Sequence, residues 1–438
     1  MKKYSKTIKS NLNSIIKEME KEPEPFVRCP GTDFTRKRKL SFSELTNILL
    51  TMGGNTIAKE LLEHLDYSKK KISASAFVQQ RKKILPYAFE YLFNKFTQSY
   101  NEFKLTKGFR ILAIDGSSLN TPRNKDCTST HFRSRDTVKG YNLTHLNAMY
   151  DIGSHLYVDA ILQPGRKVNE CSAMVDMIDR SNIEEPVLVI ADRGYESYNI
   201  FAHAAEKGWK YLIRVKDVNS NGIASTLGLP TSDAFDTTVT LDLTYEKGEK
   251  IRSELKNHRS LNSNVKFDFV GDKNSGTHYS LSFRVLRFKI SMTQYETIIT
   301  NLDGPGFSVD VIKEFYYMRW GIETSFRTLK YSIGLINFHS KDLSCITQEV
   351  FAKLTMYNFC EMITLHVVIL QKNRKHDYKA NFTMAIYCCR HYLSRKSDAR
   401  PPAIEALIQR YILPIRKGQA NPRKVRSRQS ISFIYRVA

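Results

Sequence analysis

The alternation of apolar strands and helices between residues 109 and 215 limits most strongly how this chain can fold. Three strand patterns come first, and then helix and strand patterns alternate. Strands are expected at 110–114, 143–151, 155–162, 187–191 and 209–215, and helices at 169–178 and 198–207. Three strands followed by this alternation predict an α/β fold, in which helices pack on a mixed sheet.

The segments that follow predict additions to this core. Strand-like alternation returns over about 216–301 without clear helices, which predicts an inserted β-rich subdomain. A long helix is expected from Ser308, as its N-cap, to about Ser332. Further helices are expected over 343–371 and 380–411. The order of elements is that of a ribonuclease H-like mixed sheet with flanking helices and one insertion.

Residues 1–107 carry apolar positions at helical spacing and predict a helical N-terminal domain. Basic clusters border these helices and suit a small DNA-binding module, although a solvated helical face explains any single cluster as well. The clusters lie at 36–39, 69–71 and 81–83. We therefore expect a DNA-binding domain at 1–107, a ribonuclease H-like domain at 108–340, and a helical, basic region for DNA contact or dimerisation at 341–438.

The charge of the chain makes a polyanion its natural partner. Lys and Arg number 67 against 44 acidic residues, and the formal net charge is +23. Such an excess favours nucleic acid first and an anionic membrane second. Residues 371–438 hold 16 Lys and Arg against 3 acidic residues, so about half of the excess lies there. The basic tail after Pro414 is expected to become ordered only on DNA.

The chain carries no pattern of a membrane or secreted protein. No apolar run reaches the roughly 18 residues of a membrane span, and the basic start has no apolar stretch behind it. Seven cysteines are scattered without a CxxC spacing, which favours reduced thiols over a zinc site or a disulfide frame. We therefore expect a cytoplasmic protein that does not bind a membrane.

One helical segment sets a carboxylate among side chains that can bind phosphate. We place Tyr316 at zero and add about 100° per residue. Arg319 then falls at about −60°, Glu323 at about −20° and Lys330 at about −40°, so the four share one stripe at the edge of the apolar face. Spacing alone is better explained by an ordinary helix in which Glu323 pairs with Arg319 or Arg327 one turn away.

Two aspartates follow apolar strands of the predicted sheet. Asp115 comes after the strand at 111–114 and precedes Gly and Ser, and Asp192 follows the strand at 187–191. Ligands bind at the carboxyl ends of strands in α/β sheets, so these acids are candidates for one site. Taken singly, each aspartate could instead form a turn or cap a helix. Their position ahead of a helix that carries Glu323 favours a shared site.

Three carboxylates suit the cleavage and joining of DNA. Displacement at a phosphodiester builds charge on the attacking and leaving oxygens, and two divalent ions about 4 Å apart can stabilise both. Oxygen ligands select Mg²⁺, which Mn²⁺ can replace, over zinc. We expect Asp115 to bridge two Mg²⁺ ions, with Asp192 and Glu323 each holding one. The rest of the stripe is expected to bind DNA phosphates beside the cut: Tyr316, Arg319 and Lys330.

These residues resemble a known family signature. The spacing Tyr316-x2-Arg319-x3-Glu323-x6-Lys330 is similar to the Tyr-Arg-Glu-Lys signature of insertion-sequence-4 type DDE transposases. With the segments around the two aspartates, the resemblance covers roughly residues 35 to 435. It implies cut-and-paste transposition by a ribonuclease H-like catalytic domain with a β insertion before the glutamate. It also implies binding of the element's terminal inverted repeats and of target DNA by a homodimer.

Two other functions remain compatible with the sequence. A protein derived from a transposase could bind DNA and be catalytically silent, although the three intact acids argue against this. A ribonuclease H-like nuclease could hydrolyse DNA without joining ends, and the sequence separates this poorly from a transposase. Trp209 is expected in the core, and Glu170 and His339 are left out of the predicted site.

Overall fold

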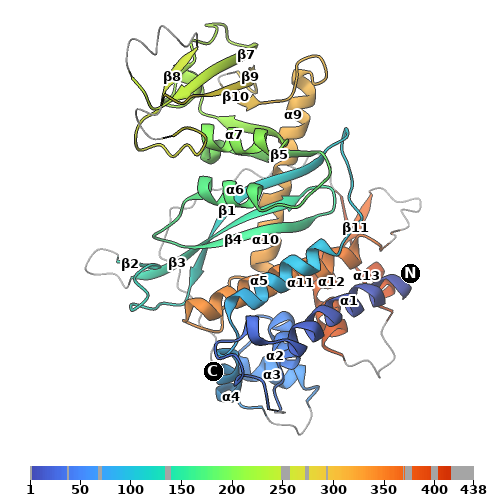
Figure 1. The fold of residues 1–438 in the computed structure, drawn as a ribbon. Coiled ribbons are helices and arrows are strands. Elements are labelled where there is room, and N and C mark those ends of the chain that lie inside the picture. The colour runs from blue at the N-terminus through green and yellow to red at the C-terminus, as the bar shows by residue number, and fades with distance from the viewer. Residues whose placement is uncertain are drawn as a thin grey trace.

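One large mixed sheet with helices on its faces forms the centre of the molecule (Figure 1). The computed structural model describes residues 2–36, 39–67, 72–133, 140–247, 257–271, 276–292, 294–367, 369, 377–395 and 403–415. Basic residues 37–38 and 69–71 and the tail from 416 onward, for which we predicted DNA contacts, lie outside this part. None of the helices in the described part is both long and apolar enough to cross a membrane.

Five strands form the core of the sheet in the spatial order β4-β3-β1-β5-β6. They are β1 (Arg110–Thr121), β3 (Tyr141–Asp151), β4 (Leu156–Pro164), β5 (Val187–Ala191) and β6 (Lys210–Val215). β3 pairs antiparallel with both β1 and β4, whereas β5 lies parallel to both β1 and β6. The short β2 (His131–Phe132) pairs with the start of β3. The predicted α/β fold with a ribonuclease H-like mixed sheet is confirmed.

The central strands are buried on both faces. Along β1, Ile111 and Ala113 enter one hydrophobic core, and Leu112 and Ile114 enter another, as the alternation of side chains in a strand requires. The second core contains α6 (Glu170–Asp179) and α7 (Tyr198–Glu206) and also holds Trp209, as predicted. The first core lies under the helices of the opposite face. This burial explains why β5 is apolar at every position.

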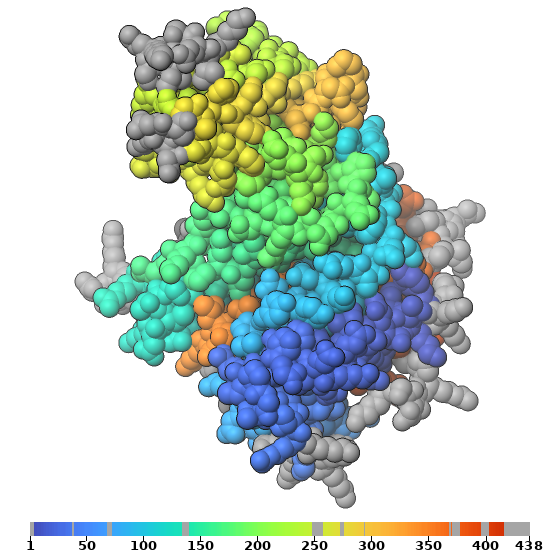
Figure 2. All heavy atoms as spheres, viewed as in Figure 1, coloured from blue at the N-terminus to red at the C-terminus, as the bar shows by residue number. Residues whose placement is uncertain are grey.

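The predicted β-rich insertion is present, and its strands extend the same sheet. They are β7 (Phe235–Thr244), β8 (His258–Ser260), β9 (Tyr279–Lys289) and β10 (Tyr295–Thr300). β10 pairs antiparallel with β6, and the order continues β10-β9-β7-β8. The insertion lies at the end of the molecule opposite the N-terminal helices, as the yellow and blue surfaces in Figure 2 show. The sheet therefore runs without interruption from the central strands into the insertion.

The long helix predicted after Ser308 is divided at Arg319 into α9 (Val309–Met318) and α10 (Trp320–Tyr331). Backbone hydrogen bonds tighten there, because the amide of Arg319 donates to the Tyr316 carbonyl (3.1 Å) three residues before it. Arg319 keeps helical dihedrals, with φ −51° and ψ −32°, so the chain continues in helical conformation into α10. Ser308 occupies the N-cap position, but its side chain accepts no capping hydrogen bond.

The predicted N-terminal helices pack around one buried helix of the C-terminal region, α11 (Leu343–Thr364). They are α1 (Lys2–Lys21), α2 (Phe42–Thr51), α3 (Ile57–His64), α4 (Ala74–Arg81) and α5 (Pro86–Gln98). Leu45 and Phe93 share one hydrophobic core with Phe351 and with Ala113 of β1. The N-terminal helices, α11 and one face of the sheet therefore bury a common interior.

Strand pairing within the predicted helical C-terminal region was not expected from the sequence. β11 (Tyr378–Ala380), which precedes α12 (Phe382–Ser394), pairs antiparallel with β12 (Ile412–Pro414), which follows α13 (Ile404–Arg410). Short 3-10 helices occur at Glu24–Phe26, Arg193–Tyr195 and Ala224–Thr226.

A buried ionic cluster joins α4 to α11. Arg81 Nη1 lies 2.8 Å from Glu349 Oε1, and both side chains are almost fully buried. His339 Nδ1 lies 3.1 Å from the other carboxylate oxygen. Burial raises the pKa of Glu349, but the charge of Arg81 and the contact with His339 outweigh it and hold this pKa at about 2. Arg81, which we placed in a basic cluster at the border of a helix, thus belongs to the interior.

Candidate active site

Asp115 lies within β1 and not at its end, which corrects the predicted boundary. β1 pairs with β5 only from Arg110 to Ala113 and then continues along β3 to Thr121. In this parallel register Ala113 stands opposite Ile190, so Asp115 and Asp192, each two residues further on, come level with each other. The strand end that creates the site is therefore that of β5.

Local backbone contacts fix both aspartates. Asp115 Oδ1 accepts a hydrogen bond from the Gly116 amide (2.8 Å), and Asp192 Oδ1 accepts one from the Gly194 amide (2.8 Å). Asp192 thereby caps the 3-10 helix that begins at Arg193, so the turn-forming role that we considered for it also holds. These bonds leave the second carboxylate oxygen of each aspartate for other contacts.

The electrostatics of Asp115 link the three predicted acids. Burial raises the pKa of Asp115 to about 6, and the negative charges of Asp192 and Glu323 add to this rise. The Gly116 amide and the guanidinium of Arg319 act in the opposite direction. Two strands and one helix thus bring acids that are 77 and 131 residues apart in the chain into one charged cluster.

Glu323 is held by an ion pair within its own helical segment. Its Oε1 lies 2.9 Å from Nη2 of Arg319, whose side chain is almost fully buried. The i,i+4 ion pair of an ordinary helix, which their spacing also predicted, is therefore present. Its charges interact with Asp115. Burial lowers the pKa of Arg319, but the charges of Tyr316, Glu323 and Asp115 outweigh it and raise this pKa. A positive charge is thus fixed next to the carboxylates.

The other two residues of the stripe point to different places. Lys330 Nζ donates to the Ser118 carbonyl of β1 (2.9 Å), three residues beyond Asp115. Burial lowers the pKa of Lys330, and the negative charge of Asp115 partly offsets this effect. Tyr316 is only 7% exposed, and its phenol faces Arg214 of β6. The structure therefore brings Arg319 and Lys330 to the acids and places Tyr316 against the sheet.

A fourth carboxylate, which we left out of the predicted site, lies beside the two aspartates. A Cβ added at Gly116 would meet Glu170 Oε1 at 2.4 Å and His145 Nε2 at 2.3 Å. A Cβ at Gly194 would lie 3.3 Å from Glu170 Oε2 and 3.1 Å from Asp192 Oδ1. The sequence signal for this approach was a glycine one or two residues after each aspartate, because glycine admits neighbours that a side chain would exclude.

The donor set of the site fits a hard divalent cation by its chemistry. Among the described residues, no three His, Cys, Asp or Glu side chains are placed to hold an ion together as they stand, and Glu323 is turned to Arg319. Carboxylate oxygens are nevertheless the ligands that Mg²⁺ and Mn²⁺ prefer. Burial is the main cause of the raised pKa of Asp115, and the negative charges of Asp192 and Glu323 add a repulsion that a bound cation would relieve.

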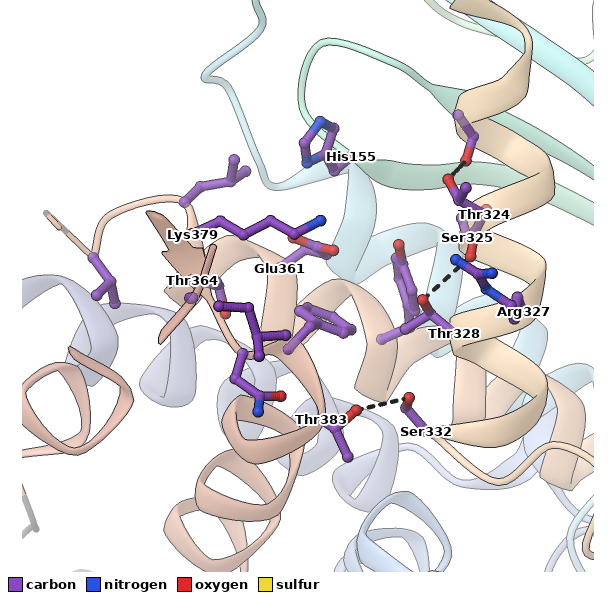
Figure 3. A pocket seen from close by; sticks show the side chains of 18 of the residues that line it. His155, Thr324, Ser325, Arg327, Thr328, Ser332, Glu361, Thr364, Lys379 and Thr383 are labelled. Carbon is purple, nitrogen blue, oxygen red and sulfur yellow. Dashed lines mark hydrogen bonds between the residues drawn. The ribbon is translucent and has the colours of Figure 1, made fainter. Parts of the chain in front are cut away.

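A cavity of about 950 Å³ lies on another side of α10 and is distinct from the acids. Figure 3 shows Thr324, Arg327 and Thr328 on its α10 wall, with Lys379 and Glu361 across from them. Asp115, Asp192 and Glu323 are not among the lining residues. The candidate active site is therefore the charged cluster over β1 and β5, and not this cavity.

Comparison with known proteins identifies the family of this chain. The model of the transposase DDE domain family matches residues 106–359, which is more than half of the chain and includes all three predicted acids. Among solved structures, the chain is similar to a piggyBac transposase in a synaptic complex with hairpin DNA, at 11% identity and a TM-score of 0.47, over 91% of this chain and 81% of that one. The curated proteins gave no match. The family model thus spans the large sheet, the acids and most of α11, and the chain belongs to the transposase DDE domain family.

Proposed function

We propose that this protein is an insertion-sequence transposase of the insertion-sequence-4 type, which cuts and joins DNA at the terminal inverted repeats of its element. One observation carries the proposal: Asp115 in β1 and Asp192, directly after the end of the parallel strand β5, come level with each other, and the charges of Glu323 and Arg319 act on Asp115. Acids at the end of a parallel strand pair, with fixed positive charge beside them, suit chemistry on a phosphodiester.

The acids are proposed to hold two Mg²⁺ ions, which Mn²⁺ can replace, with Asp115 between them and Asp192 and Glu323 as the outer ligands. When bound, the ions supply stabilisation of the charge on the attacking and leaving oxygens. Arg319 has two tasks in this scheme, because it orients Glu323 in the free protein and offers its guanidinium to a phosphate when DNA is present. Lys330, held against β1, places an ammonium near enough to Asp115 for the two charges to interact.

The proposed partner is double-stranded DNA, both the terminal inverted repeats and the target, bound by a homodimer in the DNA complex. The net charge of +23 supports a polyanionic partner. Tyr316 completes the predicted phosphate-binding set, and its place against β6 suggests that it supports Arg319, whose guanidinium lies 5.7 Å from its ring centroid.

An Asp192→Ala variant should lose DNA cleavage and keep DNA binding. Purified protein with Mg²⁺ is expected to nick DNA that carries the ends of its element, and the variant to cut at least about 10³-fold more slowly, because one carboxylate of the metal site is missing. Cleavage on gels and binding by fluorescence anisotropy measure the two effects. Asp310→Ala, which removes an exposed acid of α9, is the control.

Cleavage by Asp192→Ala at the normal rate would remove Asp192 from the site. Tight binding of the ends by the unaltered protein without any cleavage, in Mg²⁺ or in Mn²⁺, would instead favour a catalytically silent DNA-binding protein. Cleavage that never yields joined products would favour a hydrolytic nuclease.

A Lys330→Ala variant should bind DNA more weakly and with a shallower salt dependence. The loss of one phosphate contact lowers the slope of log K against log salt by about 0.9, because one fewer counterion is released. Anisotropy titrations from low to moderate salt give the slope. Lys313→Ala on α9, where the lysine pairs with exposed Asp310, should leave it unchanged. An unaltered slope for Lys330→Ala would count against a phosphate contact.

A further inference from the structure

The carboxylate of Glu170 lies between the two backbone segments that carry Asp115 and Asp192. It comes from the first residue of α6, a helix that takes no part in the predicted site. Its Oε1 is close to Gly116 and its Oε2 is close to Gly194, each at a distance that a side chain at the glycine would disturb. Glu170 therefore approaches the residues that follow both aspartates, one with each oxygen.

His145 of β3 holds one of these oxygens in place. Its Nε2 lies 2.8 Å from Glu170 Oε1, and its Nδ1 lies 3.3 Å from the hydroxyl of Ser118. Ser118 stands opposite His145 in the pairing of β1 with β3, so the imidazole is fixed on the sheet. The contact engages Oε1 and leaves Oε2 facing the segment of Asp192.

A buried hydroxyl beside these acids lacks a partner. Tyr195 is 1% exposed, and its phenolic oxygen has no hydrogen-bond partner among the described residues. The charges of Glu170, Asp115 and Asp192 all act on this phenol. Buried polar groups are rarely left unpaired in native proteins, so a bound group such as an ion with its water would complete this site.

We propose that Glu170 is a fourth carboxylate of the site, that it helps to bind a divalent cation together with Asp115 and Asp192, and that His145 positions it. The proposal rests on the proposed metal-dependent function. Glu170 offers the Oε2 oxygen that His145 does not use, and the Tyr195 hydroxyl can donate to a carboxylate or to a water on the ion. The rival explanation is structural: the contact between Glu170 and His145 could simply tie α6 to β3.

Binding of Mn²⁺ to the full-length protein without DNA tests this assignment. Electron paramagnetic resonance of free Mn²⁺ during a titration gives the dissociation constant. Glu170→Gln, which keeps the size of the side chain and removes its charge, is expected to weaken binding at least tenfold. Asp176→Asn, the same change of charge on an exposed position of α6, should alter it less than twofold. Thermal unfolding in EDTA verifies that both variants fold.

An Asp192→Asn variant separates this proposal from the function on which it rests. If Asp192→Asn weakens Mn²⁺ binding and Glu170→Gln leaves it within twofold, Glu170 is structural and the proposal fails, while the metal-dependent function stands. If the unaltered protein does not bind Mn²⁺, or Asp192→Asn has no effect on binding, the proposed function fails and Glu170 loses its role with it.

A double-variant cycle tests the part played by His145. His145→Ala alone should weaken Mn²⁺ binding by less than Glu170→Gln does. His145→Ala combined with Glu170→Gln should bind as Glu170→Gln alone, because the imidazole acts only through the carboxylate. Additive losses in the double variant would overturn the positioning role.

Discussion

Replacing Asp115 by Asn is expected to abolish DNA cleavage and to make the folded protein more stable above about pH 7. Burial, with the added charge of Asp192 and Glu323, raises the pKa of Asp115 from 3.8 to about 6, so ionising this group costs folding free energy. This cost is absent at pH values below the pKa of Asp115 in the unfolded chain. It is complete at pH values above the pKa of Asp115 in the folded protein. Two pKa units correspond to roughly 2–3 kcal/mol, which the neutral amide would recover.

Urea unfolding in EDTA at two pH values measures this gain. The variant should exceed the unaltered protein in stability at pH 8 and lose most of that advantage at pH 4. Asp126→Asn, at an exposed position, should show neither effect. Mg²⁺ should stabilise the unaltered protein more than the variant, because a ligand stabilises only the state that binds it. A variant that is less stable at pH 8 would refute the assignment of an electrostatic cost to Asp115.

Replacing Glu349 by Ala is expected to cost about 3–5 kcal/mol of stability, because it leaves Arg81 charged and buried without its carboxylate partner. Although burial raises the pKa of Glu349, Arg81 and His339 lower it to about 2 from its ordinary 4.5. A depressed pKa adds stability above the unfolded value, and this stability is lost as the pH falls from 4.5 toward 2. The penalty of the variant should therefore shrink in acid.

Chemical unfolding followed by circular dichroism gives the size of this loss. Glu314→Ala, which removes an exposed acid of α9, should cost less than about 1 kcal/mol. Arg81→Met combined with Glu349→Leu should be less harmful than Glu349→Ala alone, because no uncompensated charge is left inside. A cost below 1 kcal/mol for Glu349→Ala would mean that the cluster does not hold α4 against α11.

Strands that are buried on both faces were the most predictable part of the fold. The expected strand at 187–191 coincides with β5, because every residue in it is apolar and the run is bounded by Pro186 and Asp192. The end of β1 was predicted wrongly, since its last residues are polar and their strand conformation depends on pairing with β3. The pairing of β11 with β12 was missed for the same reason: each strand has three residues and exists through its partner.

Some residues of the candidate site could likewise be located from the sequence, and others could not. Asp192 could be located from its own segment, because a short apolar strand and a following glycine define it. Glu170 could not, because its approach to Gly116 depends on how α6 returns to the sheet. The angular arithmetic for the stripe assumed one straight helix, and the tightened turn at Arg319 separates Tyr316 from the residues after it. The spacing predicted that Arg319 and Glu323 lie close together, but it did not predict the direction in which the Tyr316 phenol points.

The unbroken sheet also fixes the distance between the candidate site and the insertion. β7 is four strands away from β5 across β6, β10 and β9. At about 4.8 Å per strand this separation is roughly 19 Å, which is the length of about five or six base pairs of duplex. Hydrogen bonds between neighbouring strands hold the separation constant. If the proposed cleavage takes place at the acids, a DNA contact made from β7 would lie at a fixed number of base pairs from the bond that is cut.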